Sequence, residues 1–153
     1  MDEPKSVPDP YAELYPALVG LLVFGGGTWF WVENAILFHN VPSFFWAFSI
    51  AFAGTTAMRQ LASHRTDYLT LLNPILAVSS TLSAVYLIRM DLIRQPEASR
   101  GGIVPDWWIS PAVFRDILTT GGTQQGQLQL AALLMASVAG LACATALIRR
   151  GRT

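Results

Sequence analysis

Glu33 and Asn34 are the residues whose type and position could most readily support chemistry, because Glu33 is the only carboxylate inside a long apolar segment. Between Pro16 and Met58 the only other ionisable side chain is His39. An ionisable group at membrane depth is energetically expensive and usually marks an ion pathway, a proton relay or a buried pair. We therefore predict that any transport site of this chain lies at Glu33 and Asn34.

An ordinary interfacial carboxylate is the alternative interpretation of Glu33. The aromatic run Thr28-Trp29-Phe30-Trp31 ends two residues before it, and tryptophans are enriched where a membrane helix meets the lipid headgroups. In this interpretation Trp29 and Trp31 anchor the helix at the interface, and Glu33 lies at or just beyond the headgroups. The sequence leaves both interpretations open.

Metal binding and covalent catalysis receive little support from the other reactive side chains. His39 and His64 bracket the second apolar segment, so they are expected about 35 Å apart at a rise of about 1.5 Å per residue and cannot share one metal ion. The single cysteine, Cys143, excludes an internal disulfide. We predict no catalytic residue and no metal site. No cofactor is identified, although bound lipids are expected.

The composition indicates a membrane protein. Hydrophobic residues make up 52% of the 153 residues, and charged residues only 13%, against about 25% in a typical soluble domain. The formal net charge is zero, which removes the electrostatic argument for nucleic-acid binding. The charges also cluster between long apolar stretches, the pattern of a chain that crosses a bilayer several times.

Four apolar segments predict an all-α integral membrane protein with four transmembrane helices in one domain. Each has close to the 20 apolar residues that span about 30 Å of hydrocarbon, and none shows the alternation of a membrane strand. Asn73-Pro74 either precedes the third helix or kinks it. The expected order is a polar tail at 1–14, helices at 15–38, 42–58, 69–90 and 127–148, a loop at 91–126, and a basic tail at 149–153.

The long third loop contains a candidate interfacial helix at about 111–120. Ser110 is a suitable N-cap, Pro111 a suitable first residue, and Gly121-Gly122 a suitable end. Its apolar residues share one face, which favours a helix lying flat on the membrane surface with Trp107 and Trp108 as anchors. A helix packed on the other loops is the alternative. Trp46, near the start of the second segment, is a further expected interfacial anchor.

An even number of spans places both termini on one side of the membrane. That side would carry six cations, Lys5, Arg59, Arg65, Arg149, Arg150 and Arg152, against four arginines on the other side. The positive-inside rule then favours cytoplasmic termini, or the equivalent compartment. We expect the cytoplasmic membrane of a prokaryote or the inner membrane of an organelle.

Rows of small residues are the strongest pattern in the sequence. One row repeats every four residues in the fourth segment, and others occur in the second. Close approach across small residues supplies much of the attraction between helices in lipid. The rows predict either packing within a four-helix bundle or contact with another polypeptide. Their members are Ala132, Ala136, Gly140 and Ala144, and Ala47, Ala51 and Thr55.

These patterns favour a small, non-catalytic accessory subunit of a respiratory, photosynthetic or transport complex. Its expected partners are other membrane subunits and the lipid bilayer, without nucleic acid. One alternative is a homo-oligomeric channel or proton-coupled transporter in which Glu33 of each copy lines a path. A less favoured alternative is a membrane enzyme for a lipophilic substrate, with a polar pocket formed from Asn34, Asn73, Ser79, Ser80, Ser83 and Tyr86.

Overall fold

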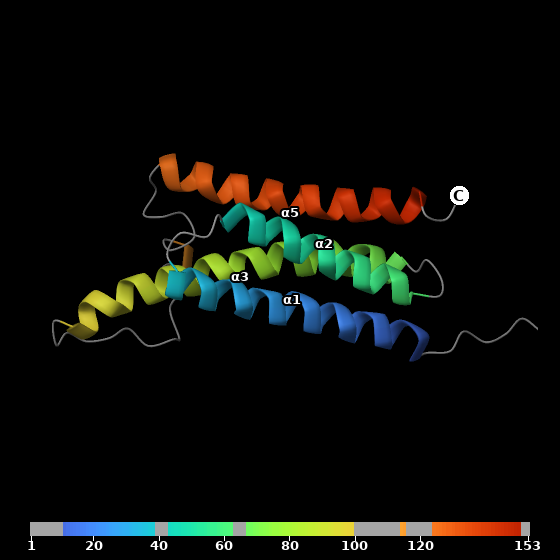
Figure 1. Cartoon of the computed structure of the whole chain (residues 1–153), viewed down its shortest axis with the longest axis horizontal. Coiled ribbons are helices and arrows are strands. Elements are labelled where there is room, and N and C mark those ends of the chain that lie inside the picture. Colours follow the sequence, from blue (N-terminus) through green and yellow to red (C-terminus); the bar gives the residue numbers. More distant parts are fainter. Residues whose placement is uncertain (1–10, 39–42, 63–66, 100–113, 116–123, 151–153) are drawn as a thin grey trace, which may run out of the picture.

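A computed structural model of the chain describes residues 11–38, 43–62, 67–99, 114–115 and 124–150. Within these ranges the fold is all-helical and contains four long helices (Figure 1). They are α1 (Tyr11–Phe38), α2 (Ser43–Leu61), α3 (Asp67–Ser99) and α5 (Gln124–Arg150). The tail at 1–10, His39, His64, Trp107, Trp108 and most of the expected helix at 111–120 lie outside the described residues.

The helices extend beyond the apolar segments that predicted them. The N-terminal end of α1 lies at Tyr11, so Pro16 is inside the helix. Helix α3 begins at Asp67 and continues through Pro74 to Ser99, so it does not start at the proline. Hydrogen bonding of the backbone does not require apolar side chains, and polar residues therefore continue each helix past its apolar segment.

The four helices lie side by side, with α2 and α3 between α1 and α5 (Figure 1). Helices α1 and α5 make no contact with each other in the described part of the chain, whereas α2 and α3 each contact the other three helices, and the contacts of α2 are the more extensive. Successive helices run in opposite directions, so the start of α1 and the end of α5 lie at the same end of the bundle. This arrangement makes α2 the most enclosed helix.

Three of the described helices are long and apolar enough to cross a bilayer. Their candidate spans are Leu14–Leu37 in α1, Tyr68–Asp91 in α3 and the whole of α5, Gln124–Arg150. Helix α2 is not among them by length and composition. The outer surface also carries many large apolar side chains, including Leu22, Ile75 and Met135, as expected for helices that face lipid tails.

Candidate functional site

Polar side chains buried between the helices form the most distinctive arrangement in the bundle, and all of their links involve α3. Thr28 of α1 and Ser80 of α3 place their hydroxyl oxygens 2.5 Å apart. Thr81 of α3 and Ser137 of α5 are 2.6 Å apart. Thr55 of α2 donates to the amide oxygen of Asn73 at 3.2 Å. Helix α3 is thus joined by a side-chain hydrogen bond to each of the other three helices.

The direction of two of these bonds follows from the number of available protons. Thr28 donates its hydroxyl proton to the carbonyl of Phe24 at 2.7 Å, and Thr81 donates to the carbonyl of Ala77 at 3.0 Å. A hydroxyl has one proton to donate, so Ser80 must donate to Thr28 and Ser137 to Thr81. Each hydroxyl therefore has a partner within the chain, which makes these groups structural links.

Helix α5 packs against α2 through its small residues. Gly126, Ser137, Gly140 and Ala144 are its buried positions. A Cβ atom at Gly140 would collide with the carbonyl oxygen of Phe48 and lie 3.1 Å from the backbone nitrogen of Phe52. The two backbones are therefore in direct contact.

The predicted small-residue rows divide between this interface and the outer surface. On α2, Ala47, Ala51 and Thr55 are all buried. On α5, Ala136 is half-buried, and Ala132 is exposed. The row of α5 thus turns from the surface into the interface along the helix.

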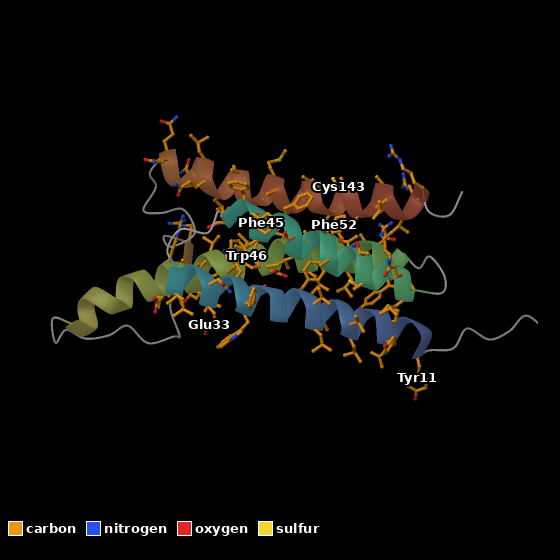
Figure 2. The ribbon with its side chains drawn as sticks, viewed as in Figure 1. Tyr11, Glu33, Phe45, Trp46, Phe52 and Cys143 are labelled. Atoms are coloured by element: carbon orange, nitrogen blue, oxygen red, sulfur yellow. The ribbon has the colours of Figure 1, made fainter. Side chains whose placement is uncertain are left out.

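Glu33 does not join any cluster of ionisable groups in the described part of the chain. It is half-exposed near the C-terminal end of α1, on the side facing away from α2 and α5 (Figure 2). It makes no hydrogen bond or ion pair there. The amide of Asn34 donates to the carbonyl of Phe30 at 2.7 Å, which is a local bond within α1. The two residues therefore do not form an enclosed polar site within this chain.

The three expected tryptophan anchors that the structure describes have different surroundings. Trp29 is 67% exposed, whereas Trp31 is 1% exposed and belongs to the apolar core. Trp46 is half-buried and packs edge-on against Phe30, with ring centroids 5.2 Å apart. The indole nitrogens of Trp31 and Trp46 are buried without an acceptor in the described residues. Only Trp29 presents most of its side chain to the surroundings.

A groove between α1 and α3 contains Ser79, Ser80 and Ser83, three of the residues that the sequence offered for a polar pocket. It is open to the outside, has a volume of about 300 Å³, and is lined mostly by apolar side chains with hydroxyls along its floor. The small residues Gly25, Ser79 and Ser83 create the space, and their spacing on two helices was the available signal. The complete lining is Leu21, Phe24, Gly25, Thr28, Trp29, Leu76, Ser79, Ser80, Ser83 and Leu87.

Metal-ligating residues are scattered over the structure. The described residues contain no group of three or more His, Cys, Asp or Glu side chains that could hold a metal ion. Cys143 is exposed on α5 (Figure 2).

Comparison with known proteins adds no constraint on the function, because no family model matches the chain and no curated protein or solved structure gives a match.

Proposed function

We propose that this chain is a four-span integral membrane protein that serves as a non-catalytic subunit of a larger membrane assembly. The observation that carries the proposal is the exposure of α5. Only 17% of its most apolar 18-residue stretch is buried in the bundle, against 39% for the corresponding stretch of α1 and 33% for that of α3. Helix α5 therefore has the most surface left for a partner.

The chemistry of that surface favours a protein helix over lipid alone. We define the outer face of α5 as its exposed small residues, which lie opposite the buried Ser137 and Gly140. Lipid-facing surfaces do not require small side chains, whereas close helix packing does. The outer face consists of Ala131, Ala132, Ala139, Ala142, Cys143 and Ala146.

The membrane part of the proposal includes α2 as the fourth span. Its 19 residues extend about 28 Å at 1.5 Å per residue, close to the hydrocarbon thickness of about 30 Å. It lies alongside three helices that are apolar enough to cross. The interhelical hydrogen bonds of Thr55, Ser80 and Ser137 give the polar groups in these helices a packing role, as expected of a bundle assembled in lipid.

Purification of the tagged full-length chain in mild detergent tests the proposal. We expect different membrane proteins to co-purify in stoichiometric amounts. A chain that purifies alone would contradict the proposal. A discrete homo-oligomer would instead favour the channel or transporter, and Glu33→Gln in reconstituted vesicles would then test the only candidate ion site.

A pair of matched variants locates the partner surface. Ala139→Phe places a large side chain on the outer face of α5, and Leu22→Phe changes an exposed residue of α1. Both positions point away from the bundle core, so the fold should tolerate both changes. We expect Ala139→Phe to reduce the recovery of partner subunits and Leu22→Phe to leave it unchanged. Equal recovery with the two variants would exclude the outer face as the contact.

A further inference from the structure

The groove between α1 and α3 has the dimensions of a single hydrocarbon chain. Its volume of about 300 Å³ lies at the lower limit of small-molecule sites. Along α3 it extends from Leu76 to Leu87, about 16 Å at 1.5 Å per residue. This length is about half of the 30 Å hydrocarbon layer, which corresponds to one leaflet.

The hydrogen bonding in the groove indicates an apolar occupant. Thr28 and Ser80 bond to each other, and Ser79 donates to the carbonyl of Leu76 at 3.2 Å. These three hydroxyls therefore need no polar ligand, and Ser83 is the fourth hydroxyl of the lining. The remaining lining is mainly leucine and aromatic side chains. A hydrocarbon chain therefore matches the apolar character of the groove.

The rims of the groove favour a flexible chain over a second helix. Large exposed side chains lie beside it on both helices: Leu18 and Leu22 on α1, and Ile75 on α3, each three or four residues from a groove residue. A helix has a diameter of about 10 Å, and these side chains would hold it away from the groove floor. An acyl chain is narrow enough to lie between them.

A negative charge lies just beyond one end of the groove. Glu33 follows the groove residue Trp29 by one helical turn, about 6 Å along α1. It is half-exposed and has no partner among the described residues. Its carboxylate therefore complements the ammonium ion of a lipid headgroup.

We infer that the groove binds one acyl chain of a phospholipid whose headgroup carries an amine, with the ammonium group at Glu33. This inference rests on the proposed membrane embedding, and it adds a specific lipid site to it. The groove supplies apolar contact over a length equal to the thickness of one leaflet, and Glu33 supplies headgroup preference. A phosphatidylethanolamine has both features, whereas a phosphatidylglycerol with the same chains lacks the amine.

The test uses the full-length protein in vesicles containing equal amounts of phosphatidylethanolamine and phosphatidylglycerol with identical chains. After extraction in mild detergent, native mass spectrometry counts the lipids retained on each molecule. We expect one retained lipid, with phosphatidylethanolamine preferred about fivefold, the size expected of a partly exposed ion pair. Glu33→Gln should keep the retained lipid but remove the preference.

Two adjacent glycines provide the matched comparison. A Cβ atom at either Gly25 or Gly26 would have nothing within 4 Å, but only Gly25 lines the groove. Gly25→Phe should remove the retained lipid, because the phenyl ring occupies the space of the acyl chain in the groove. Gly26→Phe should retain lipid like the unmodified chain. Ser83→Leu fills the groove from α3 and repeats the test if Gly25→Phe does not fold.

Several outcomes would overturn the lipid assignment. One is unchanged lipid retention in both Gly25→Phe and Ser83→Leu, and another is a loss of lipid in Gly26→Phe equal to that in Gly25→Phe. A third is a photo-crosslinker at position 25 that captures a protein subunit instead of lipid. Flotation of the protein with the vesicles after an alkaline wash is measured separately. Failure to float would contradict the membrane embedding itself, whereas flotation without a retained amine lipid would contradict only this site.

Discussion

Gly140→Ala should destabilise the bundle because the added methyl group meets backbone atoms that cannot rotate away. The new Cβ would collide with the carbonyl oxygen of Phe48, and it would lie 3.1 Å from both the Cβ of Ala51 and the backbone nitrogen of Phe52. Relief requires α5 and α2 to move apart. Overpacking of this kind typically costs about 1–3 kcal/mol.

The helix propensity of alanine acts in the opposite direction and must be separated from the collision. Alanine is favoured over glycine inside a helix by up to about 1 kcal/mol in water. Gly26→Ala gains the same propensity, and its Cβ has no neighbour within 4 Å. The difference between the two variants therefore isolates the collision, and we expect Gly140→Ala to be less stable than Gly26→Ala by about 1–3 kcal/mol.

Two further glycines extend the comparison into a ranking. A Cβ at Gly54 would lie 2.5–2.8 Å from the ring of Phe24, and one at Gly20 would meet the side chain of Met58. An aromatic ring yields less easily than a flexible thioether chain. The expected order of destabilisation by alanine is therefore Gly140, Gly54, Gly20 and Gly26.

Equilibrium unfolding by dodecyl sulfate in mixed micelles, followed by tryptophan fluorescence, measures these free energies. All four variants are compared in one detergent at one protein concentration. The reasoning would be refuted if Gly140→Ala and Gly26→Ala differed by less than about 0.5 kcal/mol, the range of ordinary surface substitutions. A larger loss at Gly20 than at Gly140 would also refute it.

Three other predictions concern the polar groups and the topology. In a double-mutant cycle, Thr81→Val and Ser137→Ala should couple by about 0.6–1.7 kcal/mol. Thr56→Val should show no coupling with Ser137→Ala, because Thr56 bonds only to its own helix; equal coupling would contradict the proposed link. Glu33→Gln should change the unfolding free energy by less than about 0.5 kcal/mol, and a larger loss would reveal a buried partner. Reporter fusions at the two termini should lie on the same side of the membrane, whereas opposite sides would mean that α2 does not cross.

The small-residue row of α5 illustrates what the sequence could predict about the interface. Steps of four residues advance 40° beyond a full turn, because each residue contributes about 100°. Three such steps separate Ala132 from Ala144, so the row drifts by about 120° around the helix. Ser137, Gly140 and Ala144 follow spacings of three and four, which keep one face. The apolar run predicted the helix, whereas regular spacing alone selected residues from both the interface with α2 and the outer surface.

The tryptophans of α1 show the same principle over a shorter distance. Trp29 and Trp31 are two residues apart and therefore point about 200° away from each other. Trp29 is exposed and Trp31 is in the core, whereas the aromatic run predicted both as anchors at the membrane interface. Helical geometry could have separated the two roles. Which of them faces inward depends on the rotation of α1 against α2 and α3, and the sequence of one helix does not determine that rotation.

Contacts between residues far apart in the sequence were even harder to predict from the sequence. The partners Thr55 and Asn73 belong to helices whose relative depth and rotation arise from the packing of the whole bundle. The sequence identified the polar residues of α3 only as candidates for a pocket. Their pairing with a hydroxyl on each neighbouring helix depends on which residues reach the same level, which local patterns do not specify.

Helix α2 connects these observations to the proposed number of spans. Hydropathy measures how well a helix tolerates lipid, and a helix enclosed by three others needs less of that tolerance. The buried residues of α2 include Ala51, Gly54 and Thr55. These residues meet α5, α1 and α3, respectively, whereas the residues that most lower the apolarity of a membrane-length stretch of α2 are Arg59 and Gln60 at its C-terminal end. The modest apolarity of α2 therefore arises from the polar residues at its end. Its apolar stretch at 43–58 is enclosed by the other three helices, which is compatible with α2 crossing the membrane.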